Sequence, residues 1–118
     1  MGLFRAGRLG AYLVGGPRRL ADVVSAARQR GKRVMVSEGQ AEPWESLTVP
    51  PNPRSHAPFS CTPADVIDNY NACMRVAARQ QFRLDAYLFW GAEYWLVRQR
   101  VGDRSYLSAV ARLLDAGG

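Results

Sequence analysis

Two short apolar runs, each ending in a cluster of acidic and indole side chains, most constrain how this chain of 118 residues can fold. Residues 34–44 read VMVSEGQAEPW, and residues 84–95 read LDAYLFWGAEYW. Both runs are rich in β-branched or aromatic residues and stop at a glycine, which is typical of buried strands. The sequence therefore predicts strands over residues 33–37 and 84–90, with polar side chains where each strand ends.

Three amphipathic segments surround these strands and predict helices. The first begins after Pro17 and ends at Gly31. The second begins with Thr62 as its N-cap in an approximate capping box, and ends near residues 80–82. Asp103 caps the third. The order helix–strand–helix–strand–helix predicts an α/β fold with two parallel strands, because parallel strands need crossover connections.

The segments VSEGQAEPW and YLFWGAEYW, in this order and with a helix between them, resemble the last third of a TIM-barrel glycoside hydrolase of the cellulase-like superfamily. The resemblance covers roughly residues 20–116 and implies a partial (β/α)8 barrel. A complete barrel needs about 200–250 residues. We therefore expect residues 20–118 to form the C-terminal β/α units, after a poorly ordered basic leader at residues 1–19. The missing upstream half of the barrel is then an expected partner.

The resemblance also implies site residues and a carbohydrate ligand. It makes Glu38 the nucleophile of a retaining glycoside hydrolase, and it places Trp90 under the sugar ring, where an indole can stack. Strict alternation along the first strand predicts that Val34, Val36 and Glu38 share one face, directed toward the barrel axis. Further candidates for substrate binding follow the two strands: Trp44, Gln40, Glu42, Glu93, Tyr94 and Trp95.

A second catalytic carboxyl group is missing from this pattern. Retaining hydrolysis needs two carboxyl groups about 5 Å apart. In the family, the acid/base glutamate lies on an earlier strand and usually follows an asparagine, and this chain has no Asn-Glu pair. We therefore expect the chain to be inactive alone. Two alternatives stay open, namely Glu42 as the functional acid and a dyad of Glu38 with Glu93.

The charge distribution suggests two other functions. Residues 1–33 hold eight bases and one acid, for a charge of +7, whereas residues 34–118 carry −1. A small basic module that binds nucleic acid or an anionic surface is one alternative. A noncatalytic carbohydrate-binding piece is the other. Aromatic residues are not interleaved with the bases, which favours a solvated helix face, so nucleic acid is not an expected partner.

The positions of cysteine and histidine and the pattern of hydropathy limit which disulfides, metal sites and cellular locations we expect. Cys61 should precede a helix that contains Cys73, which sets the two thiols too far apart for a disulfide. His56 is the single histidine and lies in a proline-rich loop over residues 40–60, so we expect no zinc site and no cofactor. The longest N-terminal apolar run, residues 11–14, is too short for a signal peptide or a membrane span, which predicts a cytoplasmic chain.

Overall fold

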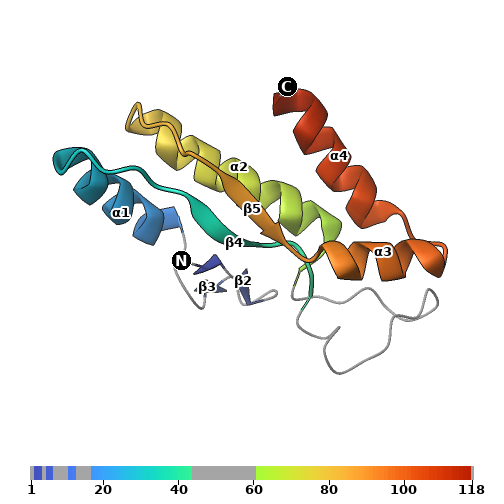
Figure 1. The fold of residues 1–118 in the computed structure, drawn as a ribbon. Coiled ribbons are helices and arrows are strands. Elements are labelled where there is room, and N and C mark those ends of the chain that lie inside the picture. Colours follow the sequence, from blue (N-terminus) through green and yellow to red (C-terminus); the bar gives the residue numbers. More distant parts are fainter. Residues whose placement is uncertain (1, 4, 7–10, 13–16, 44–60, 118) are drawn as a thin grey trace.

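The computed structural model describes residues 2–3, 5–6, 11–12, 17–43 and 61–117. They form an α/β arrangement in which helices pack on one face of a parallel sheet (Figure 1). The strands are β1 (Gly2–Leu3), β2 (Arg5–Ala6), β3 (Ala11–Tyr12), β4 (Val36–Gln40) and β5 (Tyr87–Trp90). The helices are α1 (Pro17–Gln29), α2 (Pro63–Arg79), α3 (Ala92–Arg100) and α4 (Ser105–Gly117).

The sheet has the order β1-β4-β5, and both of its pairings are parallel. The predicted parallel pairing of the two apolar runs is confirmed. β1 adds a third strand from within the predicted leader, and β2 and β3 form a separate antiparallel pair there. Residues 17–19 also belong to α1 rather than to a leader. A strand of two residues carries no readable periodicity, which is why the sequence did not indicate β1.

A β-bulge in β4 corrects the predicted assignment of side chains to faces. Val36 pairs with Tyr87 and Gly39 pairs with Phe89, so two residues of β4 stand opposite Leu88 alone. Val36 is buried against α1 and α2. Val34 and Val36 were predicted to share with Glu38 the face directed toward the barrel axis, which is the face away from the helices. This prediction was wrong, because the bulge interrupts the alternation of side chains.

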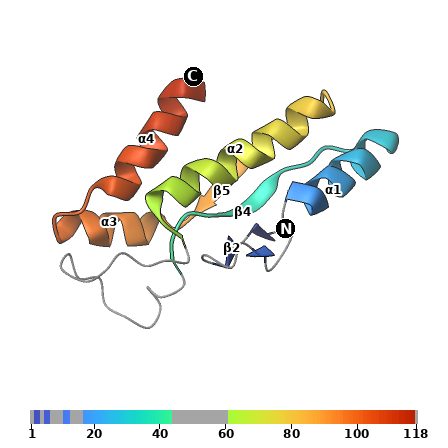
Figure 2. The ribbon, with the colours of Figure 1, turned by 180° about the vertical axis from the view of Figure 1, so that it is seen from behind.

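The second strand follows the predicted alternation. Tyr87 and Phe89 lie beneath α2, where both contact Tyr70, with ring centroids 5.1 and 5.9 Å apart respectively. Figure 2, from the opposite side, shows α2 lying over β5. Leu88 and Trp90 point to the other face and are 48% and 54% exposed. The sheet therefore presents one face to the helices and one face with exposed apolar side chains.

Gly39 lies directly against the side chain of Tyr87 on the neighbouring strand. A Cβ atom added at Gly39 would lie 2.2 Å from Cε1 of the Tyr87 ring. The ring of Tyr87 thus occupies the volume that a side chain would need. The ring packs over Gly39 beside the bulge, and the Cα–H of Gly39 that a side chain would replace is directed toward the helices.

The buried side chains form two clusters on the helix-covered face. One joins α1, β4 and the C-terminal half of α2, and the other joins the end of β4 to α2, α3 and α4. The first cluster consists of Leu20, Val24, Ala27, Val34, Val36, Cys73 and Val76. The second consists of Ala41, Cys61, Val66, Tyr94, Trp95, Tyr106, Val110 and Leu113. Cys61 and Cys73 are both buried, as predicted.

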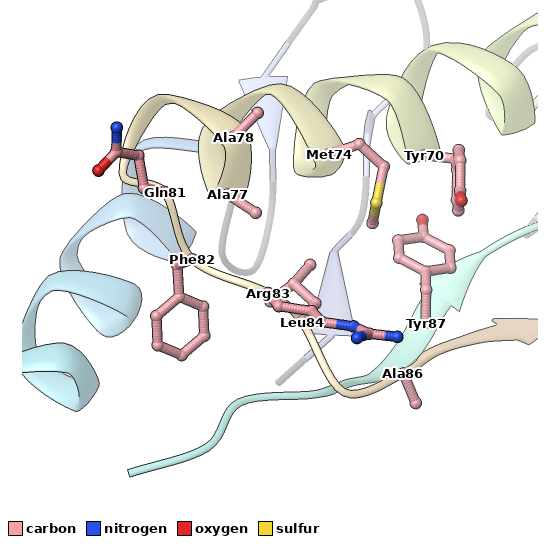
Figure 3. A pocket seen from close by; sticks show the side chains of 10 residues that line it. All are labelled: Tyr70, Met74, Ala77, Ala78, Gln81, Phe82, Arg83, Leu84, Ala86 and Tyr87. Atoms are coloured by element: carbon pink, nitrogen blue, oxygen red, sulfur yellow. The ribbon is translucent and has the colours of Figure 1, made fainter. Parts of the chain in front are cut away.

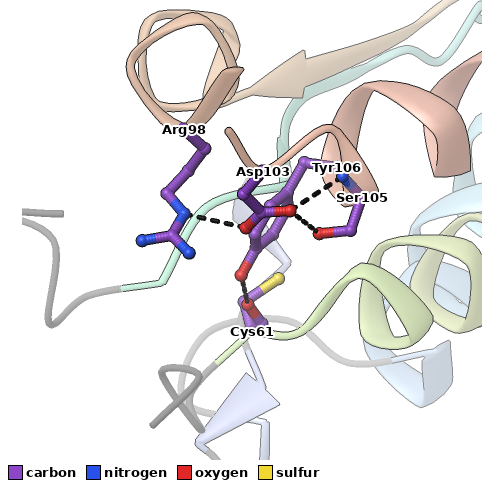
Figure 4. Close-up of polar contacts among 5 residues, drawn as sticks. All are labelled: Cys61, Arg98, Asp103, Ser105 and Tyr106. Carbon is purple, nitrogen blue, oxygen red and sulfur yellow. Dashed lines mark hydrogen bonds and ion pairs between the residues drawn. The ribbon is translucent and has the colours of Figure 1, made fainter. Parts of the chain in front are cut away.

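Side-chain caps determine where two of the helices begin. The predicted capping box of α2 is confirmed, because Asp65 N donates to Thr62 Oγ1 at 3.3 Å and Thr62 N donates to Asp65 Oδ2 at 2.9 Å. Asp103 precedes α4 and accepts hydrogen bonds from Ser105 and from Arg98 Nε, the latter at 2.8 Å (Figure 4). Partial burial raises the pKa of Asp103, but these contacts outweigh burial and hold that pKa below its usual value.

The hydroxyl group of Tyr106 connects α4 to the segment that precedes α2. It donates a hydrogen bond of 2.7 Å to the Cys61 carbonyl oxygen inside the second cluster (Figure 4). Burial, the largest cause, and the nearby Tyr94 raise the pKa of Tyr106 above its usual value. The phenol is therefore a neutral donor in the core, and its hydrogen bond fixes the chain where α2 starts.

One buried polar side chain interrupts the packing between the two clusters. Asn69 lies on the buried face of α2 between Val66 and Cys73 and is 2% exposed. Its amide nitrogen and oxygen have no hydrogen-bond partner among the described residues. An unpaired buried amide costs about 1–3 kcal/mol.

We expect Asn69→Leu to raise the free energy of unfolding by about 1–2 kcal/mol, since leucine has a similar volume and no polar group to satisfy. Urea unfolding followed by circular dichroism measures this change, and the slope with denaturant should stay constant. Asn71→Leu, at a half-buried position on the same helix, is the matched control and should change stability less. A loss of stability in Asn69→Leu would contradict the expectation.

Candidate functional site

The carboxyl ends of β4 and β5 lie side by side, which brings the segments that follow them together. Gln40 stands opposite Trp90, and Ala41 N donates a hydrogen bond of 3.0 Å to the Trp90 carbonyl oxygen. Ligands bind at this end of parallel sheets in α/β folds. The residues that follow the two strands in the chain, at this end of the sheet, include Glu42 and Glu93.

Gly91 allows the two segments to approach closely. Its φ is +146°, a backbone conformation that residues with a side chain rarely adopt. A Cβ atom at this position would lie 2.8 Å from Glu42 Cβ and 2.9 Å from the Ala41 backbone carbonyl. The absence of a side chain at Gly91 therefore lets Glu42 reach the start of α3.

Glu42, Trp90 and Glu93 form a small polar cluster at this edge, which we call the strand-end cluster. The Glu42 side chain is half-buried. Burial raises the pKa of the Glu42 carboxyl, and the negative charge of Glu93 raises it further. The polar N–H group of the Trp90 side chain partly offsets both effects on this pKa. The cluster thus holds two neighbouring carboxyl groups beside a half-exposed indole.

Tyr94 and Trp95, for which the sequence predicted sugar contacts, lie in the second core cluster. The indole Nε1 of Trp95 donates a buried hydrogen bond of 2.6 Å to the Ala41 carbonyl oxygen. Tyr94 packs edge-to-face on Tyr106, with ring centroids 5.2 Å apart. These two side chains support the strand-end cluster from the core, because α3 turns the residues after Gly91 back against α4.

Glu38 lies within the bulge of β4 and is half-buried. Gly39 is directed toward the helices, and adjacent residues of a strand point to opposite faces. Glu38 thus lies next to Gly39, on the strand beside the one that ends in Trp90. Gln40, a predicted sugar contact, is buried, and its Nε2 donates a hydrogen bond of 3.1 Å to the Glu42 carbonyl oxygen. Gln40 therefore shapes the loop that presents Glu42.

Two residues singled out in the sequence, Trp44 and His56, lie outside the described residues. Within the described ranges, no group of three or more histidine, cysteine, aspartate or glutamate side chains could hold a metal ion. In the same ranges, no helix is both long enough and apolar enough to cross a bilayer.

A hollow of the described structure lies away from the strand-end cluster. It measures about 510 Å³ and lies between the C-terminal half of α2 and the segment that leads into β5 (Figure 3). Its lining is mostly apolar and includes Met74, Phe82 and Leu84, with Arg83 contributing a charged group. None of the predicted site residues lines this hollow.

Sequence reasoning missed the pairing of Glu42 with Glu93, although it named both residues. It considered Glu93 as a partner of Glu38 instead. The signal was present in the spacing, because Glu42 is the second residue after β4 and Glu93 is the third after β5. With the strands parallel, two acids at such similar distances from the strand ends come to the same edge.

Comparison of the chain with models of protein families, with curated proteins and with solved structures found no match.

Proposed function

We propose that the chain is a partial (β/α)8 barrel that carries the nucleophile of a retaining glycoside hydrolase and binds carbohydrate. The observation that carries this proposal is the parallel pairing of β4 with β5, which brings Glu38 and Trp90 onto adjacent strands. The order α1-β4-α2-β5, with helices on one face of a parallel sheet, agrees with successive β/α units of a barrel.

In the proposed reaction, Glu38 attacks the anomeric carbon and forms a covalent glycosyl intermediate, which water then hydrolyses. Trp90 offers a flat apolar ring, 54% exposed, on which the sugar can stack. The leaving oxygen of a natural glycoside also needs a proton, and the family draws its acid/base glutamate from a strand that this chain lacks. The chain is therefore proposed to be inactive alone on natural glycosides.

The open face of the sheet supports a role for a missing upstream half. Leu88, on the same strand as Trp90, is 48% exposed, and so is Met35, which directly precedes β4. β5 has a described neighbour on only one side, and an open strand edge favours pairing with another chain. Further β/α units would extend the sheet and cover these apolar side chains.

An activated 2-fluoroglycoside tests the nucleophile without the acid. We would incubate the protein with 2,4-dinitrophenyl 2-deoxy-2-fluoro-β-D-glucoside and with its mannoside counterpart, because dinitrophenolate departs without protonation. The expected result is one glycosyl adduct, detected by intact-mass spectrometry and located on the peptide that contains Glu38. Glu38→Gln should abolish the adduct, and Glu42→Gln should retain it.

Two outcomes would contradict the proposal. One is wild-type protein that stays unlabelled by both reagents, and the other is an adduct that persists in Glu38→Gln. Binding of cellohexaose that survives Glu38→Gln but is lost in Trp90→Ala, without any adduct, would instead support a noncatalytic carbohydrate-binding piece.

Several basic side chains in the first third of the chain make structural contacts, which gives them a role other than binding an anionic partner. The Arg28 guanidinium donates a hydrogen bond of 2.7 Å to the Gln80 carbonyl oxygen at the end of α2, and Arg30 caps its own helix at Ala26. Arg33 forms an ion pair with Asp85. These contacts do not favour a nucleic-acid module, which would require binding to heparin or DNA that weakens steeply with salt.

A further inference from the structure

We propose that the hollow beside the C-terminal half of α2 binds a medium-chain carboxylate, whose hydrocarbon chain lies among apolar side chains and whose carboxylate pairs with Arg83. The hollow lies where the chain enters β5, whereas the strand-end cluster lies where the chain leaves it. The proposal is therefore separate from the proposed carbohydrate function. Three features carry it: the size and lining of the hollow, the support of its walls and the charge of Arg83.

The hollow has the size and the lining of a small-molecule pocket. Its volume of about 510 Å³ falls within the range of roughly 300–1,000 Å³ that is usual for ligand pockets. Figure 3 shows Met74 and Ala77 pointing from α2 toward the segment that leads into β5. Phe82 and Leu84 on that segment also line the hollow. A hydrocarbon chain fits this lining, because it has no polar group that would need a hydrogen bond there.

The core behind the hollow holds its walls in place. Met74, Phe82 and Leu84 are half-buried and pack against the first core cluster. The end of α2 also fixes the segment, because Phe82 N donates a hydrogen bond of 2.9 Å to the Ala77 carbonyl oxygen. Between them Gln81 has a φ of +50°, as in a Schellman motif. Walls that are already ordered lose little conformational entropy when a ligand binds.

Arg83 supplies a positive charge at the hollow. Its side chain is exposed, and no other charged residue of the described ranges lines the hollow. The nearest acid along the chain is Asp85, which forms its ion pair with Arg33 instead. Arg83 has no ion pair or hydrogen bond with any other described side chain. Its guanidinium is therefore available to an anion, and its fork of N–H groups matches the two oxygens of a carboxylate.

The charge of the lining selects the kind of amphiphile. One guanidinium balances the single negative charge of a carboxylate. A phosphate monoester carries about −1.5 to −2 near neutral pH, which would leave excess negative charge beside an apolar wall. An uncharged alcohol gains nothing from the guanidinium, and a cationic amphiphile is repelled by it. The hollow thus favours a monocarboxylate over these other amphiphiles.

The first test locates the ligand by ¹H–¹³C NMR of the whole chain with labelled methionine methyl groups, assigned with Met74→Leu and Met35→Leu. Decanoate, at pH 8 and below the concentration at which it forms micelles, should shift the Met74 signal in a saturable manner. Met35 is 48% exposed and does not line the hollow, so its signal is the internal control and should stay in place. No saturable shift of Met74, or equal shifts of both signals, would overturn the proposal.

The second test measures affinity by isothermal titration calorimetry. Arg83→Gln should weaken decanoate binding roughly ten-fold, because a hydrogen bond to a charged group contributes about this much. Arg79→Gln removes an exposed arginine of α2 that does not line the hollow, and this matched control should leave the affinity unchanged. Binding of 1-decanol should be the same in the wild type and in Arg83→Gln. Equal weakening of decanoate binding in both arginine variants would overturn the role of Arg83.

A third variant fills the hollow. Ala78 lines the hollow but is exposed, so Ala78→Trp adds an indole there without changing a buried position. It should abolish decanoate binding, while its circular dichroism spectrum stays that of the wild type. Decanoate binding that survives in the folded variant would contradict the proposed site. If this variant does not fold, the Met74 signal and the arginine variants still decide the question.

The length of the hydrocarbon chain provides a further check. Octanoate should bind the wild type about ten-fold more weakly than decanoate, because each fully buried methylene contributes roughly four-fold in affinity. Equal affinities would show that the chain does not enter the hollow. A Met74 signal that moves when the protein is diluted without ligand, and does not respond to decanoate, would identify a second copy of the chain as the occupant and overturn the proposal.

Discussion

Gly91→Ala should lower the free energy of unfolding by about 4 kcal/mol. A strained backbone conformation costs about 1–3 kcal/mol for a residue with a side chain, and φ at this glycine is +146°. Overpacking adds about 1–3 kcal/mol, because the new methyl group would lie within 3 Å of Glu42 Cβ and of the Ala41 carbonyl. Urea unfolding of the purified variant measures the loss.

Gly102→Ala is the matched control for this prediction. Gly102 also has a positive φ, +93°, but a Cβ atom there would meet no atom within 4 Å. It should therefore show the cost of backbone strain without the steric cost. If both variants lose the same stability, the close approach of Glu42 to Gly91 contributes nothing.

Trp95→Ala should lower the free energy of unfolding by about 3–5 kcal/mol, the usual cost of deleting a large buried aromatic side chain. The indole is 8% exposed and packs edge-to-face on Phe89, with centroids 6.1 Å apart. It also satisfies the Ala41 carbonyl oxygen, which would otherwise lie unpaired in the second core cluster. Thermal and urea unfolding should agree on the loss.

Two further variants separate packing from hydrogen bonding at this position. Trp95→Phe keeps an aromatic ring but has no N–H donor, so it should lose about 1–3 kcal/mol for the unsatisfied carbonyl together with the reduced packing. Leu96→Ala changes the next residue of α3, which is 53% exposed, and should stay within about 0.5 kcal/mol of the wild type. Equal losses in Trp95→Ala and Leu96→Ala would show that α3 is not anchored as described.

Local chemistry explains the parts of the fold that were predictable. The start of α2 depends on Thr62 and on Asp65, and the start of α4 depends on Asp103, and each of these caps acts within a few residues. The parallel pairing of β4 with β5 was also predictable, because a helix lies between two apolar runs. The candidate site could be anticipated only as a region, namely the polar residues after each strand.

The sequence by itself determined the helix caps, the alternation of helices with apolar strands and the identity of the acids and indoles at the strand ends. Only the tertiary structure decided which way those side chains point. The bulge in β4 lies beside Gly39, against which the Tyr87 ring packs, and the close approach of Glu42 to the segment that carries Glu93 depends on the missing side chain at Gly91. Contacts between residues about fifty positions apart produce no periodic pattern in the amino-acid sequence. Helix caps and strand patterns, by contrast, depend on residues that lie within a few positions of one another.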